Sequence, residues 1–150
     1  NLDQYLNERI FKPLDIPKPI WDTCPKGIPQ GFSGLHLTAE QLSRFGQLIL
    51  DKGVWKEKQL IPSEYIKQAT SVQIKTDDFT PFFATADYHQ GYGYQIWMNS
   101  YPNSYRMDGY LGQYVVIIPD KNAIVTYISN EYKNMTGILE LTWHTLVDKL

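Results

Sequence analysis

The strongest constraint on the fold comes from one apolar stretch late in the chain. The segment GQYVVIIP is apolar without interruption from 114 to 118 and is bounded by Gly112 and Pro119. A short apolar run with such boundaries is typical of a strand buried on both faces of a sheet. The residues DKN at 120–122 favour a turn, and AIVTYISN at 123–130 follows as a second strand. The sequence therefore predicts a β-hairpin that includes a central strand of a sheet.

Helical patterns fill most of the remaining chain. The clearest helix runs from Thr38 to Lys52, where Thr38 and Gln41 match a capping box and Gly53 provides a left-handed end. Further helices are predicted at 2–11, 63–70 and 135–150, a third strand at 92–99, and irregular connections at 13–29 and 73–89. This order predicts an α+β fold in which a three-stranded antiparallel meander is flanked by helices.

Composition and charge argue against several classes of partner. The net charge is −2 and the 14 Lys and Arg residues are scattered, so neither nucleic acid nor an anionic membrane surface is an expected partner. No apolar run reaches the length of a membrane span. The single cysteine, Cys24, excludes an internal disulfide. His36, His89 and His144 lack metal-ligand spacing to one another or to Cys24, so we expect neither a metal nor a cofactor.

Two local features are candidates for chemistry. Ser33 lies between glycines in GFSGL, but Leu35 replaces the last glycine of a nucleophile elbow and no strand precedes the segment. We interpret it as a turn that leads into the following helix. The segment from Tyr88 to Tyr114 is rich in tyrosine, which suits a cleft for a polar ligand such as a peptide or sugar, or simply packs the sheet. His89 and Tyr92 are its candidate binding residues.

Five segments, in order along the chain, resemble a known family. They are YLNERIFKPLDI, GFSGLHLTAEQLSRFGQLILDKGVW, LIPSEYIKQAT, GYGYQIW and DGYLGQYVVIIPDKNAIVTYISN. Together they resemble the C-terminal part of the serine β-lactamase and DD-peptidase-like family, in the class C branch that also contains esterases and amide hydrolases. The resemblance implies that residues 1–150 are a single piece of a β-lactamase-like domain whose N-terminal part is missing. That N-terminal part is then the expected partner.

Members of this family use three motifs, of which the first two have no counterpart here. No serine is followed by a lysine three residues later, so the Ser-x-x-Lys motif that supplies the nucleophile is absent. Three Tyr-x-Asn triplets begin at Tyr5, Tyr101 and Tyr132, and we interpret all of them as coincidental because the chain has 11 tyrosines. The chain alone is therefore not expected to turn over a substrate.

The third motif, Lys-Thr-Gly on a strand beside the cleft, is matched by Tyr110-Leu111-Gly112. The resemblance implies that the backbone N–H of Gln113 donates to the oxyanion and that Gly112 lets the substrate approach closely. Tyr110 would line the cleft without the positive charge that attracts a substrate carboxylate, and Leu111 lacks the hydroxyl that helps to bind it. These departures favour peptidase, esterase or amidase substrates over penicillins.

Two functions of different class follow. The first is the C-terminal portion of a β-lactamase-related serine acyl hydrolase acting on a small-molecule or peptide substrate. The second is a non-catalytic module of the same fold that binds a peptide or glycan. A sheet cut from a larger one has an open edge, so the isolated chain is expected to form a homodimer or a swapped oligomer. The family is often exported, which favours the cell envelope or another extracytoplasmic location.

Overall fold

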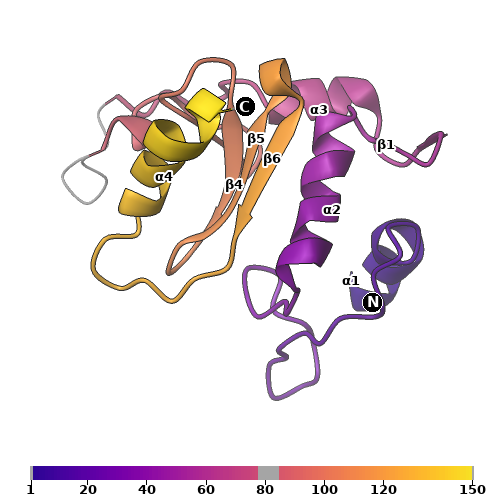
Figure 1. Ribbon diagram of the computed structural model, residues 1–150. Coiled ribbons are helices and arrows are strands. Elements are labelled where there is room, and N and C mark those ends of the chain that lie inside the picture. The colour runs from indigo at the N-terminus through magenta and orange to yellow at the C-terminus, as the bar shows by residue number, and fades with distance from the viewer. Residues whose placement is uncertain (1, 78–84, 150) are drawn as a thin grey trace.

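The protein is described by a computed structural model that covers residues 2–77 and 85–149. A four-stranded antiparallel sheet forms its centre, with helix α2 (Ala39–Leu50) on one side and a C-terminal helical segment on the other (Figure 1). The N-terminal helix lies beyond α2, away from the sheet (Figure 1). This arrangement confirms the α+β class. In the described part, no helix has the length and apolar character needed to cross a bilayer.

The sheet contains one more strand than the sequence analysis predicted. Its order is β3 (Trp97–Met98), β4 (Tyr105–Gly109), β5 (Gln113–Ile118) and β6 (Ala123–Tyr127), each antiparallel to the next. The prediction of a three-stranded meander was wrong because it omitted β4. This strand carries Arg106, which is completely buried, so its apolar pattern is interrupted where a hydrophobic core residue is expected. The strand predicted at 92–99 shortens to Trp97–Met98.

Strand β5 is central and buried on both faces, as predicted, and it separates two apolar cores. Val115 and Ile117 pack with Ile49 of α2 and with Ile66 of α3 (Ser63–Ala69). The alternate residues of β5 face the opposite core, and they are Tyr114, Val116 and Ile118. There they pack with Leu139 and Val147 of the C-terminal segment. Because side chains alternate across a strand, the continuous apolar run fills both layers at once.

Helix α2 has the caps that its sequence predicts. The Thr38 hydroxyl accepts from the backbone N–H of Gln41, and the Gln41 side chain accepts from the backbone N–H of Thr38. Gly53 follows the helix with φ +86°, a conformation that glycine adopts without steric cost. Gly46 is buried and faces Val115 of β5 and Ile124 of β6.

The N-terminal region packs against α2 through a shared apolar cluster. The helix predicted at 2–11 consists of α1 (Leu2–Leu6) and a π-helical turn, η1 (Asn7–Phe11). Phe11, Leu14 and Ile16 pack against Leu48 of α2. Beyond α2 the chain forms a small hairpin, β1 (Val54–Trp55) and β2 (Lys58–Gln59).

The C-terminal segment is helical throughout but irregular. It comprises α4 (Gly137–Leu141), the π-helical η5 (Thr142–Leu146) and the 3-10 turn η6 (Val147–Lys149), within the helix predicted at 135–150. The connection predicted at 73–89 ends in a short 3-10 turn, η3 (Ala86–Tyr88), and its residues 78–84 lie outside the described part.

Candidate active site

The residues predicted to surround the oxyanion lie in the turn between β4 and β5 and at the first position of β5. Gly109 pairs with Gln113, and Tyr110, Leu111 and Gly112 connect them. The motif-like triplet therefore occupies a turn, whereas the resemblance implied that it lies on a strand. Tyr110 is 75% exposed, and its ring stands at the tip of this β4–β5 hairpin. Gln113 opens β5 as its first residue.

The turn holds a leucine in a left-handed conformation. Leu111 has φ +66° and Gly112 has φ +80°. For an L-residue this conformation costs about 1–2 kcal/mol, and it persists only where the surroundings impose it. Strained backbone of this kind is concentrated at functional sites. The sequence gives no sign of it, because leucine is not a residue that favours positive φ.

The segment from Ser129 to Met135 imposes this conformation through contacts with the backbone of the turn. We call this segment the brace. The Ser129 hydroxyl donates to the carbonyl of Leu111 at 2.5 Å, and the backbone N–H of Glu131 donates to the same oxygen at 3.1 Å. The N–H of Leu111 contacts the sulfur of Met135 at 3.2 Å. Both backbone groups of Leu111 are therefore partnered, which fixes the peptide planes of the turn.

Gly112 and Gln113 are tied to the same brace. A Cβ added at Gly112 would lie 2.6 Å from Ile138 Cδ1 and 2.6 Å from Ser129 Oγ, so the close approach requires glycine. The side-chain amide of Gln113 donates to the backbone carbonyl of Ser129. The Glu131 carboxylate accepts from the N–H groups of residues 133 and 134, and these bonds lower the pKa of Glu131.

The end of β4 has an open edge in the described part of the chain. Strand β3 pairs only with Tyr105 and Arg106, so residues 107–109 have β5 on one side and no strand on the other. An open strand edge of this kind offers backbone N–H and C=O groups to an extended ligand. The edge leads directly into the β4–β5 hairpin.

A buried charge network lies under this edge. Asp108 accepts from Arg106 Nε at 2.9 Å and from the Tyr88 hydroxyl at 2.9 Å. Burial raises the pKa of Asp108, and this effect outweighs the opposing influence of Arg106 and Tyr88. Burial, followed by the charge of Asp108, also raises the pKa values of Tyr88 and Tyr92. The tyrosines therefore remain protonated donors at neutral pH.

Arg106 is held by partners from several segments. Its Nη1 donates to the carbonyl of Asp87 at 3.0 Å and to the side-chain oxygen of Asn99 at 2.8 Å. Its guanidinium carbon lies 4.5 Å from the Tyr88 ring centre and 5.8 Å from that of Trp97. These contacts keep a fully buried cation in place and position β4 relative to β3.

The other two predicted residues, Tyr92 and His89, do not lie on the β4–β5 hairpin. The Tyr92 ring packs against Trp97 at 4.6 Å between centres, and its hydroxyl donates to Gln95 at 3.1 Å. His89 is half-buried, and its Nε2 has no hydrogen-bond partner within residues 2–77 and 85–149. Across those residues no hydrogen bond joins His89 or Tyr92 to the hairpin.

Asp108, Arg106 and Ser129 were not among the predicted site residues. Apolar and charged residues do alternate along β4, and this alternation is a strand signal; the residues are Tyr105, Arg106, Met107 and Asp108. Charges in such a pattern are normally assigned to the solvent face, so burial of the pair could not be predicted. No group of three or more His, Cys, Asp or Glu side chains suitable for a metal occurs in the portion that the structure describes.

Solved structures identify the type of fold. The chain superimposes on a Bacillus anthracis protein provisionally named a 6-aminohexanoate-dimer hydrolase with a TM-score of 0.71 and 20% identity, covering 93% of this chain and 36% of that one. A protein from Bacteroides dorei, provisionally named a β-lactamase, matches with a TM-score of 0.68 and 18% identity, covering 89% and 45%. The fold is that of the β-lactamase-type hydrolases.

The chain belongs to the β-lactamase family, whose model, described as Beta-lactamase, matches residues 1–146. An uncharacterized protein of Alkalihalophilus pseudofirmus is 24% identical over 148 residues, a match that covers 91% of this chain and 41% of the relative. The chain thus spans less than half the length of these similar proteins. The resemblance inferred from the five segments is confirmed at the level of the family.

Proposed function

We propose that this chain is the C-terminal portion of a β-lactamase-related serine acyl hydrolase of the peptidase, esterase or amidase class. It supplies the oxyanion-side wall of the cleft, and the nucleophile comes from residues outside these 150. The observation that carries the proposal is the β4–β5 hairpin, whose left-handed Leu111 is fixed by Ser129 and Glu131. Family membership supports the reaction class, and the length of the relatives supports a missing portion.

In this proposal the backbone N–H of Gln113 donates to the oxygen that becomes negative when the serine attacks the acyl carbon. Such donors act best when their position is fixed before the reaction, which is what the brace behind the turn provides. Gly112 keeps the turn close to Ser129, and Leu111 would contact the substrate beside it.

Substrate recognition follows from the side chains around the hairpin. Tyr110 is exposed and uncharged, so it offers an aromatic surface and a hydroxyl but no counter-charge for a substrate carboxylate. The open edge of residues 107–109 suits the backbone of an extended acyl donor. Tyr92 and His89 would line the far side of the cleft. Amides and esters without an essential carboxylate are therefore the proposed substrates.

The proposal is tested by intact-mass spectrometry after incubation with a fluorophosphonate and, separately, a β-lactam. The 150-residue chain should gain no adduct because it contains no Ser-x-x-Lys motif. A longer form that includes upstream sequence should gain one fluorophosphonate group, and Ser33 should not be the residue modified. A stoichiometric adduct on any serine of this chain would contradict the proposal.

Two variants of the longer form test the role of Gln113. Gln113→Pro deletes the backbone N–H, whereas Gln113→Ala retains it and removes only the side-chain bond to Ser129. The proline variant should slow acylation about a hundredfold or more, as expected for loss of an oxyanion donor. The alanine variant should change it much less. Circular dichroism of both variants separates lost chemistry from a lost fold.

The alternative, a non-catalytic module that binds a peptide or glycan, is favoured by one observation. Tyr110 and Tyr132 are 75% and 69% exposed, and exposed tyrosines are frequent in binding surfaces. A longer form that gains no fluorophosphonate adduct, yet binds a peptide or glycan with affinity that falls in Tyr110→Ala, would establish this alternative.

A further inference from the structure

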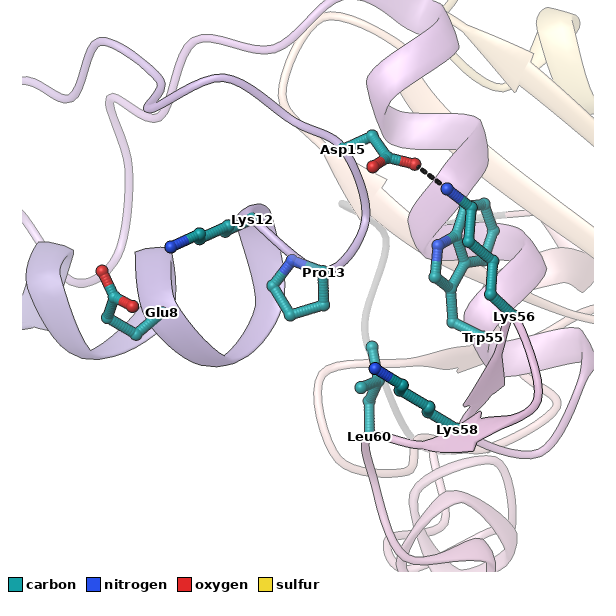
Figure 2. A pocket seen from close by; sticks show the side chains of 8 residues that line it. All are labelled: Glu8, Lys12, Pro13, Asp15, Trp55, Lys56, Lys58 and Leu60. Atoms are coloured by element: carbon teal, nitrogen blue, oxygen red, sulfur yellow. Dashed lines mark hydrogen bonds and ion pairs between the residues drawn. The ribbon is translucent and has the colours of Figure 1, made fainter.

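A cavity lies across α2 from the sheet and from the β4–β5 hairpin. It has a volume of about 440 Å³ and opens between the end of the N-terminal helix and the β1–β2 hairpin (Figure 2). Cavities of this size accommodate small organic ligands. None of its lining residues belongs to the candidate active site.

One part of the cavity wall is apolar. The indole of Trp55, the ring of Pro13 and the side chain of Leu60 line it (Figure 2). Trp55 and Leu60 also belong to the apolar cluster around Leu48, which holds this wall rigid. An apolar body can therefore pack against Trp55 and Leu60 while these two side chains stay in place.

The charges at the rim leave a net positive site. Lys56 pairs with Asp15 at 2.5 Å, whereas Lys12 and Lys58 make no ion pair with any described residue. Figure 2 shows the Lys12 ammonium extending toward Glu8 and the Lys58 ammonium extending over Leu60 into the cavity. Lys12 and Lys58 are therefore both without an ion-pair partner among the described residues, and Lys58 is the one whose side chain extends over Leu60.

The indole N–H of Trp55 is buried and donates to no acceptor in the described part of the chain. Buried donors are nearly always satisfied, so one without an acceptor points to a missing group. In Figure 2 this nitrogen is on the edge of the indole that faces Pro13, and Lys56 crosses beside the ring. The Lys56 side chain is exposed and its ammonium pairs with Asp15, so a ligand that reaches the N–H displaces this side chain from that pair.

We propose that this cavity binds a small organic monocarboxylate with a flat apolar body, such as an arylacetate. The carboxylate accepts from the Lys58 ammonium and from the Trp55 indole N–H, and the apolar body packs against Pro13 and Leu60. The Lys58 ammonium supplies a charge-assisted donor for the carboxylate, and the indole N–H completes its hydrogen bonding. This site is independent of the proposed hydrolase function.

The proposal is tested by following the indole N–H signals of the four tryptophans in ¹H–¹⁵N spectra during titration with phenylacetate. The Trp55 signal, assigned by its absence in Trp55→Phe, should shift with saturation. Lys58→Met should weaken binding at least about fivefold, as expected for loss of a hydrogen bond to a charged group. Lys26→Met, at an exposed lysine outside the cavity, should leave the affinity unchanged.

Two further probes give the result that would overturn the proposal. Phenylacetamide has the same ring without the charge and should bind much more weakly than phenylacetate. Equal affinity of the two, or no saturating shift of the Trp55 signal at millimolar phenylacetate, would refute carboxylate recognition. An equal response to inorganic phosphate would show a general anion site and would refute the role of the apolar wall.

Discussion

The contact between α2 and the sheet gives a prediction whose magnitude can be worked out from the structure. Gly46 faces the sheet, and a Cβ added there would lie 2.8 Å from Val115 Cγ1 and 2.9 Å from Ile124 Cγ2. Real Cβ atoms essentially never approach other atoms this closely. Gly46→Ala must therefore displace β5 or β6, or force the helix away from them.

Two opposing effects set the size of the change. Replacing glycine by alanine within a helix stabilises it by about 1 kcal/mol. Overpacking a tight core costs about 1–3 kcal/mol. Val115 and Ile124 are β-branched and have little rotamer freedom, and Val115 is 2% exposed, so the cost should fall in the upper half of that range. The expected result is a loss of about 1–2 kcal/mol in the free energy of unfolding.

The assay is urea unfolding followed by circular dichroism for the wild type, Gly46→Ala, Val115→Ala and the double variant. Val115→Ala removes the Cγ1 methyl, so the penalty for Gly46→Ala should shrink in the double variant, with a coupling of at least about 0.5 kcal/mol. A Gly46→Ala protein that is stabilised by about 1 kcal/mol, or strict additivity of the two changes, would refute the close-packing argument.

Three further predictions concern the charge network, the brace and the sheet edge. Arg106→Met leaves Asp108 buried without its cation and should cost about 3–5 kcal/mol in urea unfolding; a loss below 1 kcal/mol would contradict the network. The pKa of Glu131 is lowered in the folded state, so its stabilisation is present above its ordinary value of 4.5 and is lost as the pH falls through the lowered value. The difference in melting temperature between wild type and Glu131→Gln should therefore shrink in acid. A difference that does not change with pH would refute the stabilising role of the Glu131 carboxylate. Strand β6 forms an edge of the sheet and is followed by Ile128, which is 49% exposed, so sedimentation should show concentration-dependent association that Ile128→Lys weakens; a monomer at all concentrations would count against an open edge.

Local rules in the sequence predicted most of the secondary structure. The capping box of Thr38 and Gln41, the left-handed Gly53 and the apolar run of β5 each depend on neighbours a few residues away. Such features are determined by short-range sterics and hydrogen bonding, and they appear where they were predicted. Strand β4 was not predicted because Arg106 is buried through partners that come from other segments.

The geometry around the predicted site residues was less accessible from the sequence, for a related reason. Tyr110, Leu111 and Gly112 form the turn of a hairpin in which Gly109 pairs with Gln113. The bonds from Ser129 and Glu131 that force Leu111 to positive φ link positions about 20 residues apart and leave no pattern in the sequence. Their effect depends on where β6 ends relative to the turn, which only the assembled sheet determines.

The Arg106 network has a consequence for how the molecule fluctuates. The Asp87 carboxylate accepts from the backbone N–H of Ser100 and from the Trp143 indole, while the Asp87 carbonyl accepts from Arg106. Moving the segment of Ser100 or that of Trp143 away removes a hydrogen bond from a buried charge, so partial opening is disfavoured. In hydrogen exchange, the Ser100 amide and the Trp143 indole should therefore report one common opening event. The N-terminal helix packs on α2 through the cluster around Leu48 rather than on the Arg106 network, so its amides should not share this opening event.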